Sequence, residues 1–246
     1  MRNAVENINK MKKYTYLFCL LLAASILFTS CREREEDTPE NEEPYVSSSL
    51  DGVVINGVRW ATRNVDAPGT FAASPERAGM FFQWSRRKGW PATGDVTDWD
   101  ETHPTSAYWT RAKDPCPVGW RIPTIQEFIL LSEATTGTTF DSYEYHYFWI
   151  SRNWERHWVE NWRNTGANGW ILGVAPNFIF LPAAGLRNWR GVLQEVGVFA
   201  NYWSSTVENE WREPGGMSVW TSSGLGIGTI GNFGPSAMSI RCVAEN

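Results

Sequence analysis

The segment Asp114–Phe128, with the sequence DPCPVGWRIPTIQEF, contains three residues whose side chains could take part in a reaction. The thiol of Cys116 could act as a nucleophile or a redox group. The guanidinium of Arg121 could bind a carboxylate or a phosphate, and the carboxyl group of Glu127 could transfer protons. Each also has a structural explanation, and for Arg121 we expect a partner that is either a carboxylate or a carbonyl in the core.

Glu127 lies at the start of a predicted helix. Thr124 and Glu127 have the spacing of a capping box, in which the hydroxyl accepts from the N–H of Glu127 and the carboxylate accepts from the N–H of Thr124. Gly137 is typical of the residue after a helix end. The sequence therefore predicts a helix in PTIQEFILLSEATTG, with Glu127 in a structural role. Its buried stripe is expected to contain Phe128, Leu131 and Ile125 or Leu130.

The first 30 residues have the pattern of a secretory signal. Lys12 and Lys13 precede an apolar run from Tyr16 to Phe28, which is shorter than the about 20 residues that a membrane-spanning helix requires. Met11 is an alternative start, because residues 1–10 add nothing that a signal needs. The run ends in LFTSC, which resembles the lipobox of bacterial lipoproteins, although Phe28 replaces the more usual leucine. This resemblance implies cleavage before Cys31 and lipidation of its thiol; an ordinary signal cleaved nearby is the alternative.

Residues 31–46 form a predicted tether behind the lipidated cysteine. The stretch REREEDTPENEEP has seven acids and two bases, a net charge of −5, and almost no apolar residues that could bury surface. An acidic run at this place resembles the surface-export signal of Bacteroidetes lipoproteins. We therefore expect the chain at the outer membrane, lipid-anchored and exposed at the cell surface; a spacer at the periplasmic face is the alternative.

The remaining residues, 47–246, are predicted to form a single domain, because no linker interrupts them. The chain has a net charge of −5, so it offers no basic field that would attract nucleic acid. The acidic loop DVTDWDETH lacks the glycine turn and distal acid of a calcium loop. His103, His146 and His157 lack zinc spacing. We expect no metal, no cofactor and no nucleic acid partner.

Two cysteines, Cys116 and Cys242, remain in this domain, and export would place them in an oxidising compartment. A disulfide between them is the natural pairing, and it would tie the start of the helix segment to the last strand. A reactive thiol pair is the alternative.

Short strands are predicted around the helix. Asn56-Gly57 is a strong hairpin signal, because both central residues of the turn need positive φ. Five aromatic and β-branched segments separated by glycines predict antiparallel strands in the last third of the chain. These segments are NFIFLPAAGLRN, VFANYWSST, MSVWTSS, LGIGTIGNF and MSIRCVA.

Tryptophan is the unusual residue of this chain, with 15 copies. Trp154, Trp158 and Trp162 recur every four residues and would share one face of a helix. Such a face could belong to the core, or it could form a platform on which sugar rings stack. A loop conformation of this segment is a further alternative. Trp211, in ENEWREPGG, is the next candidate contact. No catalytic residue is predicted.

Several segments together resemble a known family. GVRWATRNV, CPVGWRIPTIQEF, FIFLPAAGLRN, YWSST and SIRCVAE are similar, in this order, to motifs of the Fibrobacter succinogenes major paralogous domain. RIPTIQEF and IRCV are also similar to segments of the sulfatase-modifying, formylglycine-generating proteins, which have a C-type-lectin-like fold. The resemblance implies an α+β domain of this fold, with a twisted antiparallel sheet, one or two helices and long loops. The tryptophan-rich stretch Tyr143–Trp162 lies outside the family pattern.

These observations lead to a binding hypothesis. We expect a surface-anchored adhesion module, attached to the membrane through Cys31, that binds a carbohydrate or a surface protein without catalysis. A structural or tip subunit of a surface assembly is the alternative. A formylglycine-generating-like oxidase is less favoured, because that chemistry needs an activated thiol pair in a cleft.

Overall fold

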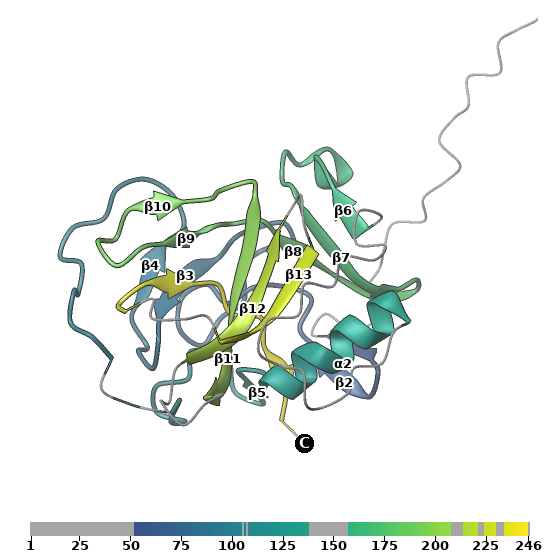
Figure 1. The fold of residues 1–246 in the computed structure, drawn as a ribbon, viewed down its shortest axis with the longest axis horizontal. Coiled ribbons are helices and arrows are strands. Elements are labelled where there is room, and N and C mark those ends of the chain that lie inside the picture. The colour runs from purple at the N-terminus through teal and green to yellow at the C-terminus, as the bar shows by residue number, and fades with distance from the viewer. Residues whose placement is uncertain are drawn as a thin grey trace, which may run out of the picture. The chain divides into compact units, whose positions relative to one another are not determined.

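A computed structural model of the chain describes residues 52–104, 106, 108–137, 157–207, 214–220, 224–229 and 234–245. The chain divides into two units, Met1–Val46 and Ser47–Asn246, and every described residue belongs to the second. These residues form one α-helix, a short 3-10 helix and four antiparallel sheets (Figure 1). An α+β fold dominated by antiparallel strands is therefore confirmed, while the C-type-lectin-like topology stays a prediction.

The sheets are small, and their neighbouring strands come from distant parts of the chain. The first has the order β1 (Val53–Ile55), β2 (Val58–Trp60), β15 (Val243–Ala244), β5 (Trp120–Arg121). The second has the order β10 (Leu193–Gln194), β9 (Leu186–Arg187), β14 (Ala237–Met238), β3 (Met80–Gln83), β4 (Gly89–Pro91). The third contains β11 (Phe199–Val207), β12 (Pro214–Trp220) and β13 (Gly224–Thr229), and the fourth contains β6 (Trp158–Val159), β7 (Gly169–Val174) and β8 (Asn177–Pro182).

The predicted hairpin at the start of the domain is confirmed. β1 pairs with β2 across Asn56 and Gly57, whose φ angles of 46° and 78° are those the turn requires. The C-terminal strand β15 then inserts between this hairpin and β5, because Val243 pairs with both Trp60 and Arg121. The two ends of the domain are thus joined in one sheet.

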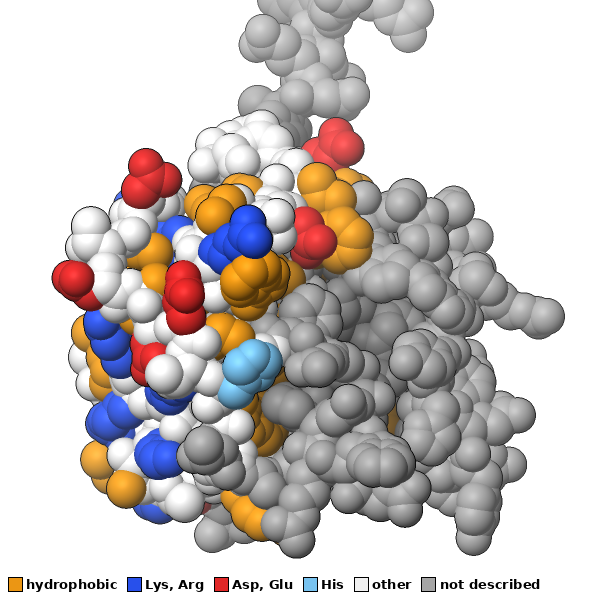
Figure 2. Space-filling view, turned by 60° about the vertical axis from the view of Figure 1, so that its left-hand side comes forward, with side chains coloured by type: hydrophobic (Ala, Val, Ile, Leu, Met, Phe, Trp, Pro, Cys, Tyr) orange, Lys and Arg blue, Asp and Glu red, His pale blue; other side chains and the backbone are white. Residues whose placement is uncertain are grey.

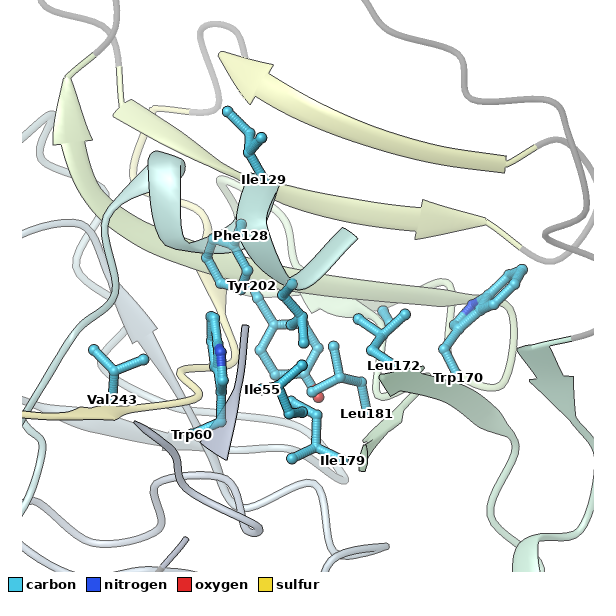
Figure 3. Packing of buried hydrophobic residues seen from close by; sticks show 12 residues of the cluster. Ile55, Trp60, Phe128, Ile129, Trp170, Leu172, Ile179, Leu181, Tyr202 and Val243 are labelled. Atoms are coloured by element: carbon cyan, nitrogen blue, oxygen red, sulfur yellow. The ribbon is translucent and has the colours of Figure 1, made fainter. Parts of the chain in front are cut away.

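Helix α2 (Ile125–Thr136) has the predicted boundaries. The Thr124 hydroxyl accepts from the Glu127 N–H at 3.3 Å, the Glu127 carboxylate accepts from the Thr124 N–H at 2.7 Å, and Gly137 ends the helix with φ 68°. Its buried face covers an apolar cluster in which Phe128 packs on Trp60 with 5.2 Å between ring centroids (Figure 3). The buried residues are Phe128, Ile129, Leu131, Ser132 and Thr135; Ile125 packs at the edge of the cluster.

Glu127 has a second partner that the sequence left open. Both of its oxygens accept hydrogen bonds from Arg121, at 2.6 and 2.9 Å, so the two side chains form a bidentate ion pair. Arg121 also donates to the Ile122 carbonyl, and it therefore has both kinds of partner expected for it. The pair joins β5 to the first turn of α2, and it gives Glu127 and Arg121 structural roles.

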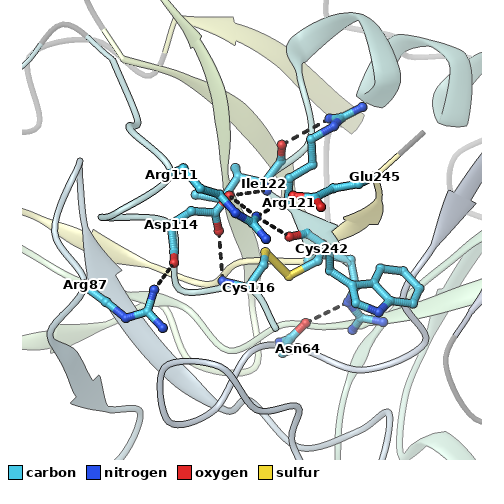
Figure 4. Close-up of a disulfide and its surroundings, with 11 residues drawn as sticks. Asn64, Arg87, Arg111, Asp114, Cys116, Arg121, Ile122, Cys242 and Glu245 are labelled. Atoms are coloured by element: carbon cyan, nitrogen blue, oxygen red, sulfur yellow. Dashed lines mark hydrogen bonds and ion pairs between the residues drawn. A yellow bond between two sulfur atoms is a disulfide. The ribbon is translucent and has the colours of Figure 1, made fainter. Parts of the chain in front are cut away.

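A disulfide joins Cys116 to Cys242, as predicted, with 6.1 Å between their Cα atoms (Figure 4). Both residues are buried in a second apolar cluster that contains Trp84, Trp203 and Met238. The bond links residues 126 positions apart, so it closes a loop that includes α2 and most of the strands.

The segment before the disulfide is fixed by the buried carboxylate of Asp114. Its two oxygens accept from the backbone N–H groups of Cys116, at 2.8 Å, and Ile122, at 3.1 Å (Figure 4). Burial raises the pKa of Asp114, although these hydrogen bonds and Arg111 act in the opposite direction. The side chain of Asp114 thus fixes the backbone at Cys116 and at Ile122.

The sheets meet around a buried arginine, Arg241, which has no measurable exposure. Its guanidinium donates to the carbonyls of Ala61, at 3.2 Å, and Phe180, at 3.0 Å, and to the side-chain oxygen of Asn64, at 2.9 Å. Asn64 in turn donates to the hydroxyl of Tyr202 in β11. Burial lowers the pKa of Arg241 to about 10. The contacts connect three of the four sheets to the last segment of the chain.

Removal of the disulfide is expected to destabilise the domain strongly. A loop of 126 residues corresponds to about 5 kcal/mol on the chain-entropy estimate. The double variant Cys116→Ala/Cys242→Ala should therefore unfold at a much lower urea concentration than the parent, measured by the loss of tryptophan fluorescence. Alkylation of the unfolded, unreduced protein is the companion measurement. Labelling of Cys116 and Cys242 in that protein would contradict the disulfide.

The ion pair between Arg121 and Glu127 predicts that the free energy of unfolding depends on pH. Burial alone would raise the pKa of Glu127, but the hydrogen bonds from Arg121 and Thr124 outweigh it and hold the pKa below its usual value. A folded pKa below the unfolded one means that the stabilisation is present at neutral pH and is lost as the pH falls through the folded pKa. Glu127→Gln should thus lower the unfolding free energy by about 1–2 kcal/mol at pH 7.

Denaturant unfolding of the parent and of Glu127→Gln between pH 7 and pH 3 checks this. The two curves should converge at the acidic end. The exposed Glu160 gives a control of equal charge change, Glu160→Gln, which should unfold like the parent throughout. The difference in unfolding free energy between Glu127→Gln and the parent could instead stay the same at every pH. That result would show that the charge of Glu127 does not stabilise the helix start.

Candidate functional site

The predicted tryptophan platform does not form as one helical face. Trp158 lies in β6 and Trp162 begins the 3-10 helix η2 (Trp162–Asn164). The Trp162 ring is 9% exposed and stacks on Phe180, with 4.5 Å between centroids and 10° between planes. Trp158 packs against Trp170 at the margin of the core. Trp162 is therefore a core residue rather than part of an open face, because its ring faces are covered.

The other predicted contacts cannot be placed. Trp154, Trp211 and the proposed lipid site Cys31 lie outside the described residues. Arg163, next to Trp162, places its guanidinium 4.9 Å from the Trp162 ring centroid. The described residues of this region thus cover the Trp162 ring and do not leave it accessible to a ligand.

An open hollow of about 690 Å³ lies on another side of the domain, beside β9 and β10. Figure 2 turns the side of the domain that carries β9 and β10 toward the viewer and shows a histidine side chain with basic, acidic and apolar side chains around it. The hollow is bordered by three segments: residues 101–103, residues 186–195 and residues 234–236. Its lining residues are Glu101, His103, Leu186, Asn188, Trp189, Gln194, Glu195, Gly234, Pro235 and Ser236.

Trp189 is the large apolar side chain of this lining that is half exposed, at 50%, and the guanidinium carbon of Arg190 lies over its ring, 4.1 Å from the centroid. It sits at the tip of the turn between β9 and β10, and Asn188 shapes that turn. The Asn188 side-chain oxygen accepts from the N–H groups of Arg190, at 2.9 Å, and Val192, at 3.1 Å. The Asn188 N–H donates to the Val192 carbonyl at 3.0 Å. The turn therefore satisfies its own backbone while it presents an indole to water.

The buried guanidinium of Arg187 also fixes the turn between β9 and β10. Arg187, 1% exposed, donates to the Gly191 carbonyl at 2.7 Å and to the carbonyls of Pro91, Thr93 and Gly94 at 2.8–3.1 Å. Burial lowers the pKa of Arg187, and the charge of Asp95 acts against this shift. Its donors thus fix the turn to the segment that follows β4.

Trp99 supports the turn from the side. Its indole N–H donates to the Trp189 carbonyl at 2.9 Å, and its ring packs on Trp90 with 4.7 Å between centroids. Gly191 lies directly on the Trp99 ring: a Cβ at this position would come within 2.7 Å of it. With φ 75°, Gly191 also has a backbone conformation that favours glycine. The exposed Trp189 is therefore carried by a rigid turn.

The acidic loop contributes Glu101 and His103 to the same lining. Asp100 accepts from the N–H of Thr102 at 3.0 Å and from its hydroxyl at 2.6 Å, and it pairs with Arg86 at 2.5 Å. These hydrogen bonds from Thr102, followed by the effects of Arg86, hold the pKa of Asp100 below its usual value. His103 then lies against Gly234, whose added Cβ would be 3.1 Å from the imidazole. These contacts fix the conformation of the loop where it borders the hollow.

The polar groups of the hollow can donate and accept hydrogen bonds. Glu195 accepts from the Asn201 amide at 3.2 Å through one oxygen, and Gln194 is exposed. Within the described ranges, no three His, Cys, Asp or Glu side chains lie close enough together to hold a metal ion. No helix in those ranges has the length and apolar character of a membrane span.

Sequence reasoning missed Trp189, although a signal was present. The motif NWRG has an Asn three residues before a Gly, which favours a tight turn. A tryptophan inside such a turn is carried away from the sheet and cannot be buried by it. The regular spacing of Trp158 and Trp162 is a more recognisable sequence pattern than a single ring in a turn, although it does not mark an exposed side chain.

Because Trp99 supports this turn, we expect two glycine substitutions to lower the free energy of unfolding by different amounts. Gly191→Ala and Gly57→Ala both place Ala at positive φ, which costs about 1–2 kcal/mol each. An added Cβ at Gly57 meets no atom within 4 Å, whereas at Gly191 it meets Trp99. Overpacking should cost Gly191→Ala a further ~1–3 kcal/mol. Thermal unfolding of both variants measures the difference, and equal losses would show that Trp99 does not support the turn.

Comparison of the chain with models of protein families, with curated proteins and with solved structures found no match.

Proposed function

We propose that this protein is a lipid-anchored adhesion module of the cell surface that binds carbohydrate in the hollow beside β9 and β10. The observation that carries the proposal is Trp189, an indole 50% exposed on a turn fixed by Arg187 and Trp99. A large apolar side chain held open to water by the fold is typical of a binding surface. Because the turn is rigid before a ligand arrives, little ordering free energy is lost on binding.

The chemistry of the hollow fits a sugar. Sugar rings have an apolar face of C–H groups that packs on an indole, and hydroxyls around the rim that both donate and accept hydrogen bonds. Gln194 and Glu195 belong to the same lining as Trp189, and Glu195 accepts from Asn201 through one of its two oxygens. His103 also belongs to the lining. An aromatic surface with a few polar groups around it is the usual composition of a small-molecule site.

The family resemblance supports the same proposal. CPVGWRIPTIQEF supplies the disulfide, β5 and the capping box of α2, and SIRCVAE supplies Arg241, Cys242 and β15. We therefore propose that the domain has the C-type-lectin-like fold of the Fibrobacter succinogenes major paralogous domain. The proposal includes no catalytic step, and the two cysteines of the described residues are joined to each other.

The proposed location rests on the N-terminal sequence. Lipidation of Cys31 would anchor the chain in the outer membrane, and the acidic residues up to 46 would form a tether. We place the domain at the cell surface because the acidic run follows the lipidated cysteine directly. The periplasmic face remains the alternative location.

A second candidate function is a subunit of a surface assembly. β10 is the edge strand of its sheet, and three valines beside it are exposed: Val192, Val196 and Val198, at 53%, 56% and 42%. An exposed apolar sheet edge can pair with a strand of a neighbouring protein. Co-purification of a defined partner protein that is lost on changing these valines would favour this function.

One cell-based experiment tests binding and location together. Cells that display the full-length chain are incubated with beads that carry a panel of glycans. The parent should capture beads of one glycan class, and Trp189→Ala should lower capture by about tenfold or more, since one aromatic contact in a small site carries that much affinity. Val118→Ala, which truncates a side chain 96% exposed and outside the lining, should capture like the parent.

The location has its own variant in this assay. Cys31→Ser should appear in the medium or the periplasm and leave the cells without capture. Protease treatment of intact cells then separates surface display from the periplasmic face. A folded, displayed parent that captures no glycan bead would overturn the carbohydrate proposal, and equal capture by Trp189→Ala would overturn the site.

A further inference from the structure

The chain contains two Asn-Gly pairs, Asn56-Gly57 and Asn168-Gly169. An asparagine followed by glycine can react with its own backbone, because the glycine nitrogen lies within reach of the asparagine side-chain carbonyl and no Cβ hinders its approach. The two pairs have the same dipeptide sequence but very different surroundings in the fold. These surroundings decide which of the two pairs is open to the reaction.

The reaction needs only water besides the chain itself. The backbone nitrogen of the glycine attacks the side-chain carbon Cγ of the asparagine, and a new C–N bond closes a succinimide ring. The C–N bond of the side-chain amide breaks, and its NH₂ group leaves as ammonia with the proton of the glycine N–H. Water then opens the ring at either of its carbonyls. The product is aspartate or isoaspartate, in which the backbone runs through the side-chain carboxyl carbon, and either product carries a negative charge.

The first pair, Asn56-Gly57, is exposed at the tip of the hairpin between β1 and β2. The strand pairing ends at Ile55 and Val58, so the ladder does not hold the two turn residues. A Cβ added to Gly57 would meet no atom within 4 Å, so water can reach the turn. The Asn56 amide donates to the Leu130 carbonyl of α2 at 3.1 Å. A single exposed hydrogen bond of this kind opens readily, so the side chain is free to turn toward the Gly57 nitrogen.

The second pair, Asn168-Gly169, is held on every side. Gly169 is buried in β7, which pairs with both β6 and β8. A Cβ added to it would come within 2.3 Å of a carbonyl oxygen of β8, so its backbone is closely covered. The Asn168 side chain is fixed at both ends: its oxygen accepts from the Asn161 N–H at 3.0 Å, and its nitrogen donates to the Gly197 carbonyl at 3.4 Å. The ring cannot close here until this part of β7 leaves the sheet.

We propose that Asn56 is a site of spontaneous modification in the folded protein, where it converts to aspartate and isoaspartate, while Asn168 stays intact. The inference is independent of the proposed binding function. Its consequence lies at the contact with α2, because the carboxylate of either product has no proton to donate to the Leu130 carbonyl. Isoaspartate also adds a methylene group to the backbone of a two-residue turn. The modified hairpin therefore loses its hydrogen bond to the helix.

The test follows both asparagines in one sample of the full-length chain. The folded protein is incubated at pH 8 beside protein that is denatured and reduced, until half of the asparagine at these two sites has converted in the denatured sample. Fragment-ion mass spectrometry locates the change in mass at each site. In the denatured chain the two sites should convert at similar rates. In the folded protein Asn56 should convert about tenfold or more faster than Asn168, because Asn168 has to wait for local opening of the sheet.

Two variants separate the reaction from its consequence. Gly57→Ala should slow the conversion of Asn56 severalfold, because its Cβ hinders the attacking nitrogen. Asn56→Asp reproduces one product and should lower the thermal unfolding midpoint by about 2–4 °C through loss of the hydrogen bond to Leu130. The proposal is overturned if Asn56 stays intact in the folded protein, or if Asn168 converts there as fast as Asn56. An unchanged midpoint in Asn56→Asp would overturn the consequence for α2 and leave the modification site standing.

Discussion

The fold depends on a buried charge, Arg241, that has no ion-pair partner among the described residues. Arg241 is buried at the junction of the sheets, and its guanidinium donates to two backbone carbonyls and to Asn64. A buried cation costs several kcal/mol unless hydrogen bonds replace the lost water. Here the hydrogen-bond acceptors belong to the residue after β2, to β8 and to a side chain that also contacts β11. The guanidinium is therefore satisfied only when these strands come together, and so it selects one arrangement of the sheets.

A second buried arginine that donates to backbone carbonyls lies at the candidate site. Arg187 is also buried, and its donors are directed at carbonyls from two segments that would otherwise be loops. A lysine could not replace either arginine, because a single ammonium cannot direct donors to acceptors spread around a planar fork. The rigidity of the Trp189 turn thus comes from the core beneath it.

Local signals in the sequence predicted local structure well. The capping box of Thr124 and Glu127, the Asn-Gly hairpin and the end of α2 at Gly137 were all predictable, because each depends on residues a few positions apart. The disulfide was predictable from composition, since only two cysteines remained in the domain. The order of strands in the sheets was not, because β15 pairs with β2 and β5 through contacts that span most of the domain.

The site was harder to predict than the fold. The spacing of Trp154, Trp158 and Trp162 suggested a helix, but the glycine and asparagine residues that follow favour turns, and β6 pairs with β7 instead. Trp162 then gained a stacked partner in Phe180. The hollow combines residues from three distant segments. No pattern in a single segment can indicate such a site, and only the exposed position of Trp189 had a local signature.

The central positions of β14 and β15 determine when the domain can close. Without residues 237–244, the first sheet separates into the β1–β2 hairpin and an isolated β5, and the second separates into the β3–β4 and β9–β10 hairpins. Arg241 and Cys242 belong to the same segment. In a chain made from its N-terminus these two sheets therefore stay incomplete until residues 237–244 emerge, and isolated hairpins are marginally stable. Until then the strand edges that β14 and β15 cover stay unpaired, and an unpaired strand edge is a site at which a second chain can pair.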